Sequence, residues 1–275
     1  MRPVFEILPS GYEPENCTLI CEVNNEGFSY CVRDENSKTF PGVAVYHFDQ
    51  KKPSAGFPIA LQVLFHQQEI FSRKFQKVCV VYSFPESVLI PFSMYNPERN
   101  QTMMNMMFGD VNSGDMILTD VITGQSMFNC YRIHTATLEM VKTQFPNAAI
   151  SHQYSNLFKK KVGENDRLNV IFYSQKIVVD VQKEGKHLLL NSFEYSAAQD
   201  APYILLNICR QFGVQKMPLH ISGLIEENSS LYKELYKYFD EIEFAKLRDD
   251  YSYADAITNF SSHYFSYIFD IDPCE

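Results

Sequence analysis

The sequence predicts an α/β protein made of two copies of one β-β-β-α-β unit, and three observations support this fold class. The composition is that of an ordered globular chain, with 45% hydrophobic and 21% charged residues. A length of 275 residues suffices for one large domain or for two, each with its own core. Elements expected to begin near 18, 28, 43, 57 and 77 recur in the same order near 167, 176, 187, 200 and 218.

The first copy opens with a hairpin over residues 17–33. Its alternating apolar residues predict one buried face, and the loop NNEG at 24–27 has the composition of a tight turn. We expect Val23 to pair with Phe28, which places the apolar residues of both strands on the same face. A strand at 43–48, a helix at 57–75 and a strand at 77–82 follow. The run KVCVVY at 77–82 is typical of a strand buried on both sides.

The second copy repeats this order. Strands at 167–174 and 176–181 form a hairpin, and a third strand runs over about 187–193. A helix follows at 200–212, where Asp200 caps the start, Pro202 lies in the first turn and Gly213 ends the helix. The segment PLHIS at 218–222 predicts the fourth strand, and a helix is expected at 231–239.

Between the copies we expect strands at 115–118 and 125–132, a helix near 134–145 and a less defined segment at 148–161. The polar run KKKVGEN at 159–165 is the natural boundary. We therefore expect a first lobe over residues 1–160 and a second over 161–275.

Charge and hydropathy exclude several function classes. With 24 basic and 33 acidic residues, the net charge of −9 lacks the basic footprint of a nucleic-acid binder. No apolar run approaches the eighteen residues that a membrane span requires. The first residues contain no apolar signal core, so a cytoplasmic location is expected.

Seven cysteines occur, with no CxxC pair among them. Because they fall mainly on apolar strand faces and helix stripes, we expect buried free thiols in a reducing compartment. The paired short spacings of a zinc site are missing, so no metal is expected.

Four segments carry a resemblance to a known family: EGFSYCV (26–32), LLLNSFEY (188–195), DAPYILLNICRQFG (200–213) and NFSSHYF (259–265). Together they make the chain similar to an uncharacterised Bacteroidetes family with the actin-like ATPase fold. The resemblance implies two tandem ribonuclease-H-like lobes, each of β-β-β-α-β-α type, facing a nucleotide cleft. It implies no established activity.

In that superfamily, an acid and a glycine separated by one residue form a phosphate loop after the first strand of each lobe. Glycine lets the backbone approach phosphate, and the acid holds the waters of the metal ion. Here Glu22 stands at the acid position, but Asn24 replaces the glycine. The hairpin register places Ile171 and Tyr173 at the corresponding positions of the second lobe.

The superfamily also ends one strand in two glycines that pack on adenosine, and this sequence keeps only Gly223. If a nucleotide binds, the candidate residues are therefore Glu22, Gly27 and Gly223. We favour simpler interpretations of these residues. Glu22 is then an exposed charge on a strand, Gly27 a glycine of the hairpin turn and Gly223 a glycine at the end of a strand.

The segment TMMNMMF at 102–108 is unusual, because it gathers four methionines on an expected helix. Methionine makes a soft, adaptable apolar surface. The side chains either fill a gap between the lobes or contact a protein partner, in which case the binding residues are Met103, Met104, Met106 and Met107.

Two functions are consistent with these observations. The first is a non-catalytic protein-interaction scaffold with a degenerate actin-like ATPase fold, a monomer or weak homodimer that needs no cofactor. The alternative is a divergent nucleotide-binding ATPase that uses ATP with Mg²⁺. The degraded phosphate loops favour the scaffold, because fold alone does not determine function.

Overall fold

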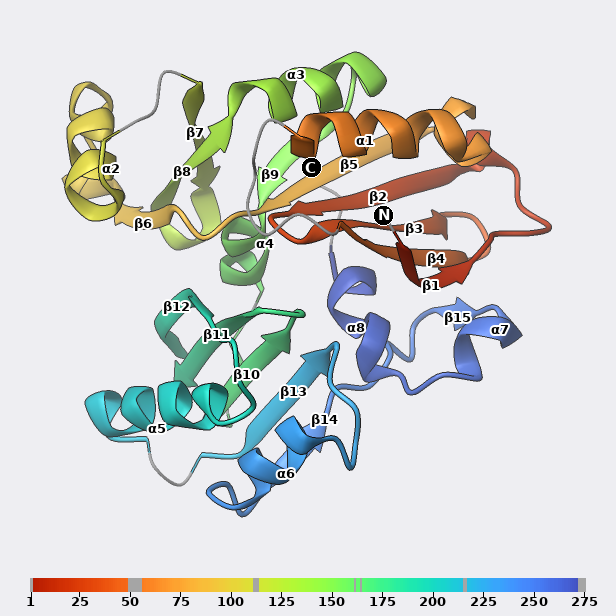
Figure 1. Cartoon of the computed structure of the whole chain (residues 1–275). Helices are drawn as coiled ribbons and strands as arrows, with labels where there is room; N and C mark the ends of the chain where they lie inside the picture. The colour runs from red at the N-terminus through yellow and green to blue at the C-terminus, as the bar shows by residue number, and fades with distance from the viewer. Residues whose placement is uncertain are drawn as a thin grey trace. The chain divides into compact units, whose positions relative to one another are not determined.

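The computed structural model describes residues 2–48, 56–110, 114–160, 162–163, 165–214 and 217–271 (Figure 1). The chain divides into two compact units. The first contains the described residues up to Lys159, Asp250–Ile257 and Ile271, and the second contains those of Lys160–Asp249 and Thr258–Asp270. The chain passes from the first unit to the second between Lys159 and Lys160, next to the boundary expected at residue 160. Residues Asp250–Ile257 belong to the first unit again.

The main sheet of the first unit has the strand order β1-β4-β3-β2-β5-β9, with β15 also beside β4. The strands β2, β3 and β4 are antiparallel, whereas β5 and β9 run parallel to β2. These strands are β1 (Arg2–Ile7), β2 (Cys17–Asn24), β3 (Gly27–Asp34), β4 (Thr39–His47), β5 (Lys77–Ser83), β9 (Ala149–His152) and β15 (Ser252–Tyr253).

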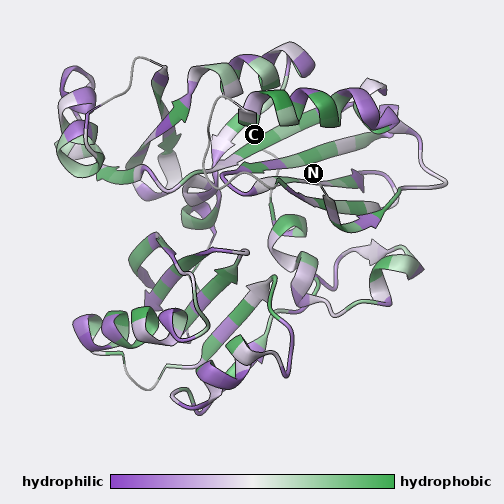
Figure 2. Ribbon diagram, in the orientation of Figure 1, coloured by the Kyte–Doolittle hydropathy of each residue, from purple (hydrophilic) through white to green (hydrophobic). Residues whose placement is uncertain are grey.

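Helices α1 (Gly56–Gln67) and α3 (Thr135–Gln144) contact each other and cover one face of this sheet (Figure 1). Hydrophobic residues concentrate along β2, β5 and α1 (Figure 2). The alternation expected in the hairpin is confirmed, because Val23 pairs with Phe28. All seven apolar residues of that face belong to the core: Cys17, Leu19, Cys21, Val23, Phe28, Tyr30 and Val32.

The first helix ends earlier than the sequence predicts. It stops at Gln67, and the chain turns through an extended Gln68 into the 3-10 turn η2 (Glu69–Ser72). This turn places Phe71 in the core, 5.5 Å from Phe28 and 5.1 Å from Phe65 between ring centroids. Edge-to-face aromatic packing of this kind adds to the free energy gained by burial, so the core interrupts the helix.

A small antiparallel sheet of order β6-β8-β7 also belongs to the first unit. It consists of β6 (Ser87–Pro91), β7 (Asp115–Ile122) and β8 (Met127–His134), accompanied by α2 (Asn100–Phe108) and α4 (Gln153–Lys159). Short 3-10 turns connect these elements: η3 (Phe92–Met94), η4 (Pro97–Arg99) and η5 (Thr123–Gln125). Another such turn, η1 (Pro14–Asn16), precedes β2.

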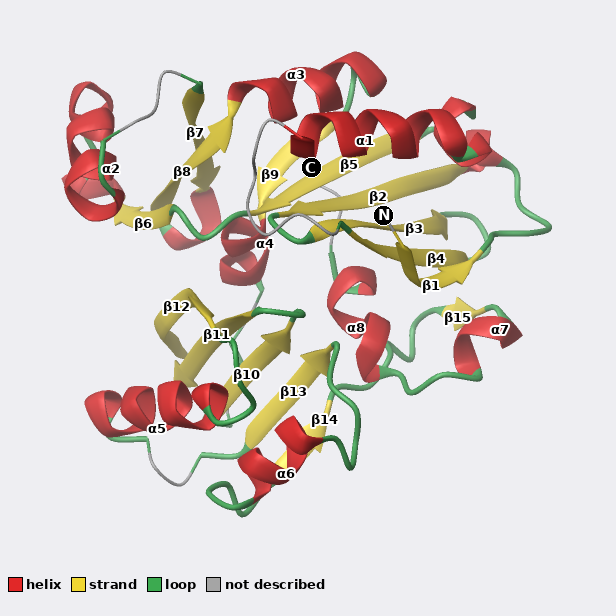
Figure 3. Cartoon of the chain, in the orientation of Figure 1, coloured by secondary structure: helices red, strands yellow, loops and turns green. Residues whose placement is uncertain are grey.

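The second unit contains a five-stranded sheet of order β12-β11-β10-β13-β14 (Figure 3). Its strands are β10 (Arg167–Phe172), β11 (Lys176–Lys183), β12 (Lys186–Glu194), β13 (Leu219–Gly223) and β14 (Ile242–Phe244). Its helices are α5 (Asp200–Phe212), α6 (Ser230–Tyr236) and α8 (His263–Phe269). The short α7 (Asp255–Thr258) precedes α8, and all but its last residue belong to the first unit. The orders β4-β3-β2-β5 and β12-β11-β10-β13 match, which confirms the duplicated α/β fold.

Six of the seven cysteines lie in the described part of the chain, and all six are buried free thiols. Burial raises the pKa of the Cys17 thiol to about 11, and it also raises the pKa values of Cys21 and Cys31. A buried thiol with a raised pKa is a poor nucleophile, because the thiolate is the reactive form. Cys274 lies outside the described residues.

Core packing predicts contrasting effects at two positions of α1. Leu61 is fully buried, whereas Ile59 is 60% exposed on the same helix. We expect Leu61→Ala to lower the free energy of unfolding by about 2–5 kcal/mol, because it leaves a cavity. The control Ile59→Ala should change it by less than about 0.5 kcal/mol. Chemical denaturation measures both, and equal effects would contradict the packing described here.

Thiol labelling tests the burial of the cysteines. In a Cys274→Ser variant at pH 8, we expect the native protein to react slowly and the denatured protein to release six thiols. Unfolded thiols ionise near pH 8.5, whereas burial raises the pKa values of five native thiols: Cys17, Cys21, Cys31, Cys130 and Cys209. Stability should therefore fall as the pH rises above about 8.5. Rapid labelling of the native variant would contradict the buried positions.

Candidate functional site

Glu22 lies near the carboxyl end of β2 and is fully buried, so its interpretation as an exposed strand charge is wrong. The parallel pairing of β2 with β5 brings this end of β2 beside Ser83. Ser83 Oγ donates to Gln153 Oε1 at 2.5 Å, and Gln153 Nε2 lies 3.4 Å from Glu22 Oε1. The carboxylate is thus one member of a polar chain that joins β2, β5 and α4.

The turn after β2 is built differently from a phosphate loop. Asn24 is buried, and its Oδ1 accepts a hydrogen bond from the backbone N–H of Glu26 at 2.8 Å. This side-chain turn occupies the position where glycine would leave the backbone open to phosphate. Gly27 opens β3, and a Cβ there would lie 1.9 Å from the carbonyl oxygen of Tyr46. Close approach to β4 therefore accounts for the glycine.

The equivalent turn in the second unit carries neither an acid nor a glycine. Phe172 pairs with Ile177 as Val23 pairs with Phe28, so the turn residue Tyr173 occupies the position of Asn24. The backbone N–H of Tyr173 donates to the carbonyl of Lys176 at 2.8 Å, and the Tyr195 hydroxyl donates to the carbonyl of Tyr173 at 2.7 Å. The Lys176 ammonium lies 4.5 Å from the centre of the Tyr173 ring, a cation–π distance.

Gly223 ends β13 with a φ of +87°, a conformation that favours glycine. A Cβ at this position would lie 2.2 Å from the carbonyl oxygen of Phe172. That carbonyl accepts the backbone N–H of Leu224 at 2.7 Å. Backbone conformation and the contact with β10 therefore account for this glycine.

Asp120 is the centre of a polar network that the sequence analysis did not predict. Its carboxylate accepts hydrogen bonds from the Tyr131 hydroxyl (3.0 Å), the His152 N–H (2.7 Å) and the Ser155 hydroxyl (2.6 Å). Burial raises the pKa of Asp120, and these hydrogen bonds oppose the rise because they favour the charged form. The network joins the small sheet to β9 and α4, which is a structural role.

The side chain of His152 is also fixed by the protein. Its Nε2 lies 3.0 Å from the carbonyl oxygen of Phe84, which only accepts, so this nitrogen carries the proton. The other ring nitrogen, Nδ1, then accepts the backbone N–H of Tyr154 at 3.1 Å. Both nitrogens are occupied, so this histidine is not poised for acid–base chemistry.

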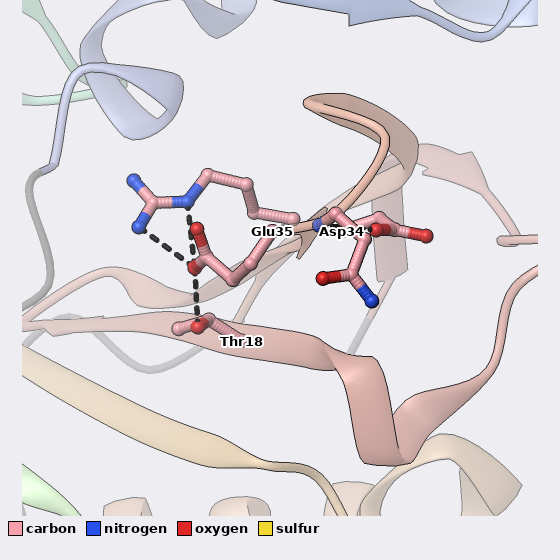
Figure 4. Close-up of polar contacts among 5 residues, drawn as sticks. Thr18, Asp34 and Glu35 are labelled. Carbon is pink, nitrogen blue, oxygen red and sulfur yellow. Dashed lines mark hydrogen bonds and ion pairs between the residues drawn. The ribbon is translucent and has the colours of Figure 1, made fainter.

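A second polar cluster lies at the opposite end of the β2–β3 hairpin (Figure 4). Glu35 Oε1 accepts hydrogen bonds from Thr18 Oγ1 at 2.6 Å and from Arg33 Nη2 at 2.8 Å. The guanidinium of Arg33 lies 5.7 Å from the centre of the Tyr251 ring. Asp34 accepts the N–H groups of the next turn at 2.9 Å. The cluster fixes the hairpin end and the segment that leads into β15.

The methionines of α2 divide into buried and exposed members. Met104 is fully buried against Ile90 and Cys130, and Met103 packs against the same cluster. Met104 is therefore not a partner-binding residue, because its side chain fills the space between α2 and the small sheet. Met106 and Met107 are 83% and 58% exposed.

Further apolar side chains are exposed on the same small sheet and its connections. The exposed apolar set comprises Phe92, Met94, Met106, Met107, Met116 and Val121. In the same subdomain, Tyr95 stacks on Phe128 with ring centroids 3.8 Å apart. Arg132 anchors α2, since its Nη2 donates to the carbonyl of Gly109 at 3.0 Å while its Nη1 lies 3.0 Å from Glu86. These contacts fix the end of α2 to the small sheet.

Among the described residues, no group of three or more His, Cys, Asp or Glu side chains is arranged to hold a metal ion. Within the same residues, no helix is both long enough and apolar enough to cross a membrane.

Comparison with solved structures shows an actin-like ATPase fold. A Bacteroides thetaiotaomicron protein with this fold and unknown function gives a TM-score of 0.69 at 18% identity, covering 84% of this chain and 91% of that one. A chain of the PilM–PilN type IV pilus biogenesis complex gives 0.59 at 11%, covering 94% and 97%. The ethanolamine utilization protein EutJ from Carboxydothermus hydrogenoformans gives 0.51 at 9%, covering 96% and 91%.

No curated protein matches the chain. A family model described as "Protein of unknown function (DUF3822)" matches residues 10–242, which is most of the sequence. The chain therefore belongs to the DUF3822 family, whose function is unknown.

Proposed function

We propose that this protein is a non-catalytic interaction module with a degenerate actin-like ATPase fold, and that it binds a protein partner through the small sheet and α2. The observation that carries the proposal is the exposure of Met106 and Met107 on α2 and of Phe92 and Met94 in η3, all within the subdomain of the small sheet. Large apolar side chains gathered on one subdomain are typical of interaction sites. Methionine side chains also adapt to a partner at little cost in strain.

The two hairpin turns support the absence of nucleotide chemistry. In the first unit the Asn24 side chain closes the turn, and in the second unit Tyr173 and Lys176 occupy it. Gly223 is the remaining glycine of the adenosine motif. Its positive φ and its close contact with the carbonyl oxygen of Phe172 explain the glycine without a nucleotide. The alternative, a divergent ATPase that uses ATP with Mg²⁺, keeps support only from the carboxylate of Glu22.

Two other observations agree with an interaction module. One solved relative in fold, PilM, was determined as a complex with PilN, so this fold accommodates protein binding. The buried free thiols fit a reducing compartment, and we place the protein in the cytoplasm.

We expect no ATP hydrolysis above background and no rise in melting temperature with Mg-ATP. Binding at a hundredfold excess over Kd would stabilise the protein by about 2.7 kcal/mol, which a thermal melt detects readily. Phosphate release and the melt are measured on the wild type and on Glu22→Gln, which keeps the size of the side chain and removes its charge. Turnover in the wild type that disappears in Glu22→Gln would establish the ATPase alternative.

Substitutions in α2 distinguish the effect of its exposed methionines from that of its buried methionine. We expect the double variant Met106→Glu/Met107→Glu to keep the wild-type melting temperature, because both side chains are exposed. Met104→Glu should destabilise the fold by roughly 3 kcal/mol or more, because it buries an unpaired charge.

Co-purification from the native host then tests binding. The wild type and the control Tyr203→Glu, an exposed residue of α5, should retain a common partner that the double variant loses. Retention of the same partner by a folded double variant would refute the proposed contact surface.

A further inference from the structure

The sulfur atoms of the chain divide into a buried set and an exposed set. All six cysteines in the described part of the chain are buried free thiols. Burial also raises the pKa of five of them: Cys17, Cys21, Cys31, Cys130 and Cys209. Because oxidants attack the thiolate form at accessible positions, these cysteines are poor targets for oxidation.

The exposed sulfur atoms belong to methionines of one subdomain. Among the described residues, the exposed methionines are Met94, Met106, Met107 and Met116. They lie in η3, α2 and β7, which all belong to the subdomain of the small sheet. Met140 and Met217, which lie elsewhere, are partly buried and pack against the cores of the two main sheets. The sulfur that an oxidant reaches first is therefore concentrated on this subdomain.

The buried methionine of α2 separates a change of this surface from damage to the fold. Met104 packs against Ile90 and Cys130 and is fully buried. Oxidation of a core methionine places a polar sulfoxide among apolar side chains and disrupts the packing. The end of α2 is also held by the hydrogen bond from Arg132 to the carbonyl of Gly109, which involves no methionine. Oxidation confined to the exposed methionines therefore leaves α2 in place.

We propose that the exposed methionines are sites of reversible oxidation by a hydroperoxide, and that their oxidation abolishes partner binding at the small sheet and α2. The first part concerns this chain alone and stands on the exposure of its sulfur atoms. The second part rests on the proposed function, because it assigns a regulation to the same contact surface.

The oxidation transfers one oxygen atom to sulfur. The thioether lone pair attacks one oxygen of the hydroperoxide, so that an S–O bond forms and the O–O bond breaks. Sulfur loses two electrons and the peroxide gains them, and the proton on the transferred oxygen passes to the leaving hydroxide to give water. In the reverse reaction a dithiol reductant supplies two electrons and two protons, becomes a disulfide and releases the sulfoxide oxygen as water.

A sulfoxide changes the surface that a partner would cover. The thioether of methionine is apolar and adaptable, whereas the sulfoxide oxygen is polar and must lose its bound water when a partner buries it. Met106 and Met107 are adjacent on α2 and change together. We therefore expect oxidation to weaken binding of an apolar partner surface by about tenfold or more.

Mapping of oxidised residues tests the first part. The Cys274→Ser variant is treated with hydrogen peroxide at neutral pH, and tandem mass spectrometry of its peptides gives the oxidation rate of each methionine. We expect the exposed methionines to oxidise about tenfold or more faster than Met104 in the native protein, and at similar rates in denaturant. Native Met104 that oxidises as fast as Met106, or a described cysteine that oxidises before the exposed methionines, would overturn the sites.

Thermal melting shows whether the oxidised protein keeps its fold. At the dose that oxidises the exposed methionines, the wild type should keep the melting temperature of the untreated protein, because Met104 stays reduced. A large fall in melting temperature would identify the reaction as damage and would overturn the switch.

Co-purification from the native host tests the second part. The peroxide-treated wild type should lose the common partner, and treatment with the two methionine sulfoxide reductases, one for each sulfoxide epimer, should restore it. The matched variant Met94→Leu/Met106→Leu/Met107→Leu/Met116→Leu keeps an apolar surface of similar volume without a thioether. It should keep the partner after the same peroxide treatment.

The outcomes distinguish failure of the switch from failure of the proposed function. Retention of the partner by the folded, oxidised wild type would overturn the switch and leave the contact surface standing. An untreated wild type that retains no partner would refute the proposed function and the switch with it. The oxidation rates decide the modification sites in either case.

Discussion

Each unit depends on one parallel strand pair. The first strand of the hairpin pairs with the strand that follows the helix, β2 with β5 and β10 with β13. Parallel pairing requires a crossover, and the helix in that crossover buries its apolar side on the sheet. The same pairing brings the carboxyl ends of both strands to one edge. That is why Glu22 and Ser83, far apart in sequence, belong to one polar chain.

The sequence predicted the elements that this pairing organises. The hairpins were found because their core faces alternate, and α5 was found with its observed ends, with Gly213 directly after its last residue. The expectation that Asp200 caps α5 is wrong, because its carboxylate accepts the N–H groups of Ser196 and Ala197, which precede the helix. The elements that were missed carry weak signals. β1 contains Pro3 and an irregular pairing, and β9 has only four residues. Alternation needs more residues than these strands provide.

The candidate site was only partly predictable. The positions of Ile171 and Tyr173 followed from hairpin register, since pairing in a tight turn depends on local sequence. The burial of Glu22 did not follow, because β2 is buried along its whole length on both faces and alternation describes only one face. Four methionines are spread around α2, so hydropathy alone could not distinguish the buried Met104 from the exposed Met106. The small sheet beneath the helix makes that distinction.

Duplication leaves the two units free to diverge wherever the core does not constrain them. Both keep an apolar face of alternating residues beneath a helix, because exposing that face costs free energy in either copy. Turn residues and sheet edges are not bound in this way. The same turn holds Asn24 in one unit and Tyr173 in the other. Within the part of the chain that the structure describes, β4 has neighbours on both sides, whereas β12 pairs only with β11. Turns and edges can therefore change between the two copies while both cores stay intact.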